Sequence, residues 1–72
     1  MHDMLNDVIE ILLKKGIDFS IERDGYHFYV SANNWVVHFS ITLKGIIARN
    51  LKSGNVQLFM DVKAAMDYII NN

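Results

Sequence analysis

The sequence of 72 residues predicts a two-layer α+β domain, with a helix at each end and an antiparallel meander of four or five strands between them. Two observations carry this prediction. Apolar and polar residues alternate through most of 17–43, and Asp-Gly and Asn-Asn pairs divide this stretch into three strands joined by tight turns. Segments with the apolar spacing of amphipathic helices flank the meander at 4–15 and 62–70.

The first helix is expected over 4–15, where the apolar residues form one broad stripe. Asp3 can cap its amino end, and Lys14 and Lys15 suit the negative end of the helix dipole. Gly16 then favours the end of the helix. The stripe contains Leu5, Val8, Ile9, Leu12 and Leu13.

The first two strands are expected to form a hairpin through Asp24-Gly25, because a type I′ turn needs positive φ at both central positions. This turn would pair Ile21 with Phe28, so that apolar side chains meet across the strands. A slip by one residue would move every side chain to the other face, which makes this agreement informative.

Asn33-Asn34 is expected to join the second and third strands, because asparagine tolerates left-handed backbone geometry. A two-residue turn there pairs Phe28 with Phe39, again on the apolar face. Trp35 begins the third strand in inward phase, and we expect it to close one end of the core.

The later part of the chain carries weaker signals. Lys44-Gly45 could close a hairpin into a fourth strand at 46–50, which would pair Ile41 with Ala48. The same pairing would place Asn50 opposite a core phenylalanine, which is unfavourable unless the strand ends or bulges there.

A turn cluster at 52–55 favours a short last strand at 56–59. Asp61 is then expected to cap the closing helix at 62–70. The whole chain forms one domain in this interpretation.

Both helices need an apolar surface to cover, and the meander offers one continuous apolar face. We therefore expect both helices on that face and the opposite face, called the outer face below, to be uncovered. Its mixture of aromatic, aliphatic and arginine side chains with few like charges is typical of protein interfaces. The predicted partner-binding residues are Tyr29, Val36, His38, Ile47 and Arg49.

Composition argues against several other classes of function. The absence of cysteine excludes a disulfide framework, thiolate catalysis and a cysteine zinc site. A formal net charge of -1 gives no general attraction to nucleic acid or to an anionic membrane. No apolar run approaches the roughly 20 residues that span a bilayer, and the start lacks the basic region of a signal peptide. We expect a cytoplasmic protein with no membrane contact.

The predicted register places Glu22, His27 and Ser40 in one row of the outer face, the residue types of a hydrolase triad. A flat sheet offers neither a pocket nor oxyanion donors, so we interpret these as solvated polar residues and expect no enzyme. His27 and His38 with Glu22 could bind a divalent ion only weakly, because a structural zinc site has four ligands. No metal or other cofactor is therefore expected.

Nucleic-acid binding through the same face is the alternative, with Tyr29 as a stacking platform. The order helix, three strands, helix also resembles that of double-stranded RNA-binding domains, in topology alone. The segment 55–61 lacks the lysine cluster that such domains carry before their last helix, and Arg49 is the clear cation of the face.

The favoured function is therefore a small non-enzymatic protein-interaction module that binds a protein partner or a second copy of itself. A homodimer would be the simplest assembly, because one patch can be complementary to itself across a two-fold axis. By analogy with its size, the chain would suit a phage or mobile-element accessory protein or inhibitor.

Overall fold

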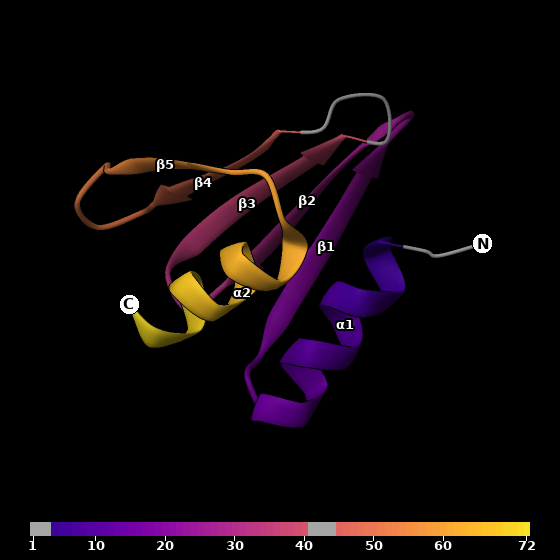
Figure 1. Cartoon of the computed structure of the whole chain (residues 1–72), viewed down its shortest axis with the longest axis horizontal. Coiled ribbons are helices and arrows are strands. Elements are labelled where there is room, and N and C mark those ends of the chain that lie inside the picture. Colours follow the sequence, from indigo (N-terminus) through magenta and orange to yellow (C-terminus); the bar gives the residue numbers. More distant parts are fainter. Residues whose placement is uncertain (1–3, 41–44) are drawn as a thin grey trace.

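The computed structural model describes residues 4–40 and 45–72. Within them, five strands form one antiparallel sheet in the order β1-β2-β3-β4-β5, and a helix lies at each end of the chain (Figure 1). The predicted α+β class is confirmed. The elements are α1 (Met4–Lys15), β1 (Phe19–Asp24), β2 (His27–Ala32), β3 (Trp35–Ser40), β4 (Ile46–Asn50), β5 (Val56–Phe59) and α2 (Val62–Asn71).

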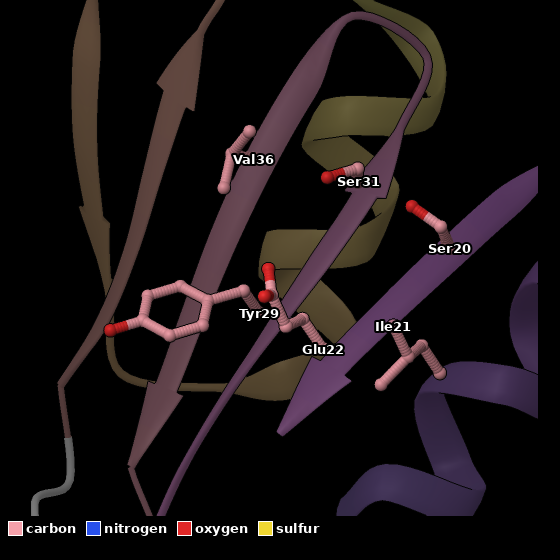
Figure 2. Close-up of a pocket in the computed structure, with 6 residues that line it drawn as sticks. All are labelled: Ser20, Ile21, Glu22, Tyr29, Ser31 and Val36. Atoms are coloured by element: carbon pink, nitrogen blue, oxygen red, sulfur yellow. The ribbon is translucent and has the colours of Figure 1, made fainter. Parts of the chain in front are cut away.

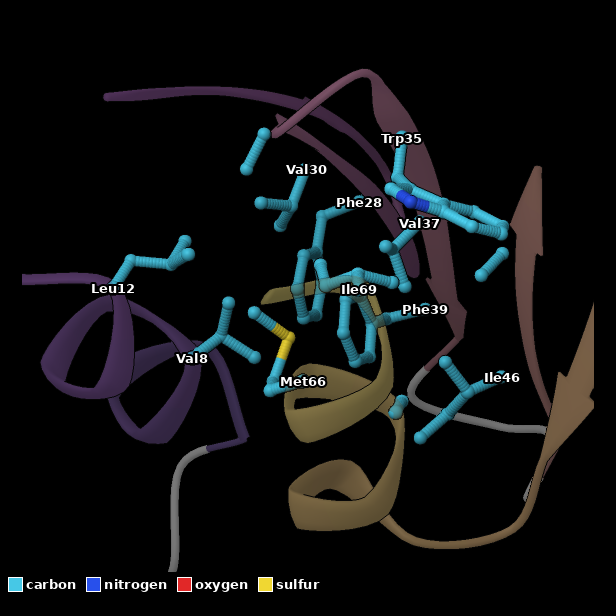
Figure 3. Close-up of a cluster of buried hydrophobic side chains, with 13 residues drawn as sticks. Val8, Leu12, Phe28, Val30, Trp35, Val37, Phe39, Ile46, Met66 and Ile69 are labelled. Carbon is cyan, nitrogen blue, oxygen red and sulfur yellow. The ribbon is translucent and has the colours of Figure 1, made fainter. Parts of the chain in front are cut away.

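Both helices pack on the same face of the sheet, as predicted (Figure 1). Val8 of α1 and Met66 of α2 are fully buried, and Figure 3 shows the Met66 side chain between Val8 and the aromatic residues of the sheet. Those residues are Phe28 and Phe39, whose rings stack with centroids 4.7 Å apart. Trp35 is buried, with its ring edge-on to Tyr68 of α2, as expected of a residue that closes the core.

The first turn differs from the prediction. The structure pairs Asp24 with His27, so Gly25 and Tyr26 occupy the turn and Ile21 lies opposite Val30. Gly25 has φ 61°, while Tyr26 is not among the residues with positive φ. This combination suits a type II′ turn, in which glycine takes the first central position. The predicted pairing of Ile21 with Phe28 is therefore wrong.

The second turn is confirmed. Asn33 and Asn34 have φ values of 49° and 66°, as a type I′ turn requires, and Phe28 lies opposite Phe39. The Asn33 side chain also donates from Nδ2 to the backbone oxygens of Ile69, at 2.6 Å, and Ile70, at 3.3 Å. The turn thus holds the carboxyl end of α2 against the sheet.

The register of β4 also differs from the prediction. Asn50 lies opposite Trp35 at the end of the sheet, and Ala48 lies opposite Val37. The expected partner Ile41 lies outside the described residues, as do 42–44. At the sheet end Asn50 Oδ1 accepts hydrogen bonds from the backbone nitrogens of Lys52 and Ser53, both at 2.9 Å. This register is preferable because a polar side chain is satisfied in a turn rather than buried against phenylalanine.

The remaining elements lie where the sequence predicts them, although Leu13 of the predicted apolar stripe is exposed and Ile11 packs against the core instead. The predicted strand 56–59 is β5, and Asp61 caps α2 by accepting a hydrogen bond from the backbone nitrogen of Ala64 at 3.1 Å. The predicted first helix coincides with α1, whereas its proposed cap at Asp3 lies outside the described residues. Across 4–40 and 45–72, no helix is long and apolar enough to cross a membrane.

Both register corrections shift the strands by an even number of residues. Because side chains alternate with a period of two, an even shift changes the cross-strand neighbours but leaves each side chain on its predicted face. The side chains predicted to face the helices and those predicted to face away from them therefore keep these faces in the structure.

Candidate partner-binding face

The outer face consists of the side chains of the sheet that point away from the helices. The five predicted binding residues lie on β2, β3 and β4 in two adjacent rows, so the structure brings them together. One row runs through Glu22, Tyr29, His38, Ile47 and Leu58. The other runs through Ser20, Ser31, Val36, Arg49 and Val56.

Three rings form the centre of this face. The Tyr29 ring stacks on His38 with centroids 4.7 Å apart and planes 16° apart. The His38 ring also lies 5.0 Å from the ring of His27, and His27 Nδ1 is 2.9 Å from His38 Nε2. This hydrogen bond needs one nitrogen with a proton and one without. The rings restrain one another, which lowers the entropic cost of ordering them when a partner binds.

The apolar part of the outer face lies on β4 and β5. Ile47 is 44% exposed, and its neighbour across the ladder, Leu58, is 67% exposed. Val56 lies beside Arg49 and is also exposed. The sequence analysis missed Val56 and Leu58, although their alternation with Gln57 in the predicted last strand could have placed them on this face.

A hollow of about 550 Å³ lies on the β1 side of the sheet (Figure 2). Tyr29 and Val36, two of the predicted binding residues, line it. The hydroxyl oxygens of Ser20 and Ser31 and the carboxylate of Glu22 also line it. The hollow therefore offers hydrogen-bond acceptors to a partner, at the margin of a larger apolar contact.

Charges on the outer face are few and separated. Glu22 and Asp24 lie on β1 at one edge, whereas Arg49 lies on β4. The centre of the face thus carries no aspartate, glutamate, lysine or arginine side chain. Such a distribution resembles that of protein interfaces, whose centres are depleted of charge.

The predicted triad row is not formed. Glu22 lies opposite Tyr29, and the ladder places Asp24 and Ser40 on either side of His27. His27 Nδ1 contacts the other histidine, and Ser40 is only 3% exposed, so its hydroxyl is not open to a substrate. In the described part of the chain no three His, Cys, Asp or Glu side chains are grouped to hold a metal ion.

Comparison with protein-family models, with curated proteins and with solved structures finds no match to this chain. The fold and the outer face define it as an α+β domain whose helices cover one side of a meander sheet.

Proposed function

We propose that this chain is a small non-enzymatic protein-interaction module that binds a protein partner through the outer face. One observation carries the proposal: the two helices cover one side of the sheet, while the other side presents a contiguous set of aromatic and aliphatic side chains. Water-exposed apolar surface of this kind favours association, because its burial releases free energy in proportion to its area.

The chemistry of the face supports a protein rather than a small ligand as the partner. Tyrosine and arginine are enriched among the residues that dominate binding energy at protein interfaces. Tyr29 lies near the centre, and Arg49 lies beside the exposed aliphatic residues Ile47 and Val56. A partner with an apolar centre and an acidic group over Arg49 would match this pattern.

The nucleic-acid alternative finds less support on the same face. A tyrosine stacked on a histidine could present a platform to a base, but a binder of nucleic acid surrounds such a platform with cations. Here Glu22 and Asp24 would repel phosphates on the β1 side. A module of this size that acts by binding would suit an accessory protein or inhibitor encoded by a phage or mobile element.

The test compares two tagged variants with the wild-type chain as bait in lysate of the producing cells. Ile47→Ser/Arg49→Ser removes two outer-face side chains, and Leu13→Ser removes an exposed apolar side chain from α1 as a control, with Leu13 65% and Ile47 44% exposed. Proteins retained by the wild-type chain and by Leu13→Ser, but lost from the outer-face variant, would support the proposal. Retention by both variants alike would contradict it, and loss of the partner after nuclease treatment would favour nucleic acid.

A further inference from the structure

The two edges of the sheet differ in charge. The edge strand β1 carries Glu22, Arg23 and Asp24, and charged side chains discourage an edge from pairing with another chain. The opposite edge strand, β5, carries no charge, and neither do the residues on either side of it at 55 and 60. Of the usual protections of an edge, β5 has neither charge nor proline and relies on its shortness of four residues.

The hydrogen bonds at the end of the sheet show which backbone groups face this edge. The Asn50 nitrogen donates to the Asn55 oxygen at 2.8 Å, and the Leu51 nitrogen donates to the Asn34 oxygen at 2.8 Å. Because bonding directions alternate along an antiparallel strand, residues 57 and 59 bond toward β4. The backbone N–H and C=O groups of Val56 and Leu58 then point away from the sheet, as a template for another strand.

The side chains of β5 are exposed as well. Val56 is 59% exposed and Leu58 is 67% exposed on the outer face, and Gln57 is exposed on the other face. In Figure 1 the β4–β5 hairpin extends beyond the end of α2, so the helical layer does not cover its tip. A second strand could therefore approach β5 from the tip of the hairpin without meeting a helix.

We propose that β5 pairs in antiparallel fashion with β5 of a second copy of this chain, joining the two sheets into one. Residues opposite each other in such a pair must share a face. The register that bonds the free backbone groups of both residues within β5 places Val56 opposite Leu58 of the second copy. Gln57 then lies on the two-fold axis, opposite Gln57 of the second copy.

A second copy is the occupant that the charges favour. An uncharged strand can lie beside itself without repulsion between like charges, which a two-fold axis would otherwise impose. The antiparallel arrangement also brings the end of β5 near Lys52 toward the end near Asp61 of the other copy, so the flanking charges are opposite. The pairing involves only the four residues of β5 and falls below a standard interface, so we expect a weak, reversible dimer.

The dimer is independent of the proposed function, because it uses the edge of the sheet rather than its outer face. If both hold, the two outer faces lie side by side and can engage two partner sites at once, which raises avidity. The experiments below measure self-association alone, so their failure leaves partner capture by the outer face to be judged separately.

The first experiment uses the absence of natural cysteine. Gln57→Cys places two thiols across the axis at a non-hydrogen-bonded pair, where Cα atoms are about 4.5 Å apart, within the range of a disulfide. Mild oxidation of concentrated protein should give a covalent dimer. Val56→Cys is the matched control, because its two thiols lie on diagonal positions two residues apart along the strands, where Cα atoms are about 7–8 Å apart and beyond the usual range of a disulfide. Equal cross-linking of the two variants, or none at Gln57→Cys, would overturn the proposal.

The second experiment removes a backbone donor. Leu58→Pro deletes an N–H that points away from β4, so the β4–β5 ladder is expected to persist. Sedimentation should show a concentration-dependent dimer for the wild-type chain and at least about tenfold weaker dimerisation for Leu58→Pro. Leu58→Lys charges the edge without changing the backbone and should weaken dimerisation in the same way. It replaces Leu58→Pro in the test if circular dichroism shows that the proline variant is misfolded. A wild-type chain that stays monomeric at millimolar concentration, or a dimer that both variants retain, would refute the pairing.

Discussion

Asn33 performs two tasks that can be separated by substitution. Its backbone adopts φ 49° in the turn between β2 and β3, and its side chain donates to the carbonyls of Ile69 and Ile70 in the last turn of α2. Those carbonyls have no partner within the helix, so the side chain supplies one. Asn34 has φ 66° in the same turn but makes no such bond among the described residues. Glycine at either position keeps the backbone geometry, whereas only Asn33→Gly removes the link to α2.

The magnitude follows from the two bonds. The bond to Ile69 is short, at 2.6 Å and partly buried, and should contribute about 0.5–1.5 kcal/mol. The bond to Ile70, at 3.3 Å and exposed, should add little. Because the backbone and entropy changes of the two glycine variants largely cancel, Asn33→Gly should be less stable than Asn34→Gly by about 1 kcal/mol. In a domain of this size that difference corresponds to about 4–8 °C in Tm.

The assay is thermal and urea unfolding followed by far-UV circular dichroism, with both variants and the wild-type protein side by side. Asn33→Asp provides a further comparison, because it keeps the shape of the side chain but replaces the donor with an acceptor. It should be at least as destabilised as Asn33→Gly, since a carboxylate beside helix carbonyls is repelled. Equal Tm values for Asn33→Gly and Asn34→Gly would refute the conclusion that this turn anchors α2.

Two further predictions concern the outer face. Ser20→Cys/Ser31→Cys should form an intramolecular disulfide under mild oxidation, because β1 and β2 pair Ser20 with Ser31. Ser20→Cys/Tyr29→Cys should form none. The reverse result would support the register with Asp24-Gly25 in the turn. A double-mutant cycle of His27→Ala and His38→Ala should give a coupling of about 1 kcal/mol in the free energy of unfolding, because each single change removes the 2.9 Å contact between the two rings. Additive effects of the two substitutions would show that this contact contributes nothing to stability.

The sequence predicts the faces of the sheet better than its turns. Alternation along β2 and β3 assigns Phe28 and Phe39 to the interior without any knowledge of the pairing, and both are buried. The first turn was misplaced because Asp-Gly satisfies a type I′ pattern, whereas the chain uses Gly25 at the first central position of a different turn. Both turns bury the same apolar side chains, so hydrophobicity alone does not distinguish them.

The pairing of β4 depends on interactions that local sequence reasoning does not weigh. A tight Lys44-Gly45 turn is locally reasonable, but it would bury Asn50 against the core. The structure instead places Asn50 where its side chain accepts two backbone hydrogen bonds. The unfavourable position of that asparagine argues against the tight turn at Lys44-Gly45, although the local pattern does not specify the register that replaces it.

Functional inferences from the sequence differ in how far they depend on register. The triad hypothesis required Glu22, His27 and Ser40 in one row, and a shift of two positions removed Glu22 from that row. The binding-face hypothesis required only that Ile47 and Arg49 point away from the helices, and an even shift preserves this. Catalysis needs reacting atoms aligned to a fraction of an ångström, whereas a protein-binding face needs only a contiguous set of aromatic and aliphatic side chains. In a meander sheet, the alternation of side chains therefore predicts which residues share a face even where the turns are misplaced, and this is enough to support a binding hypothesis.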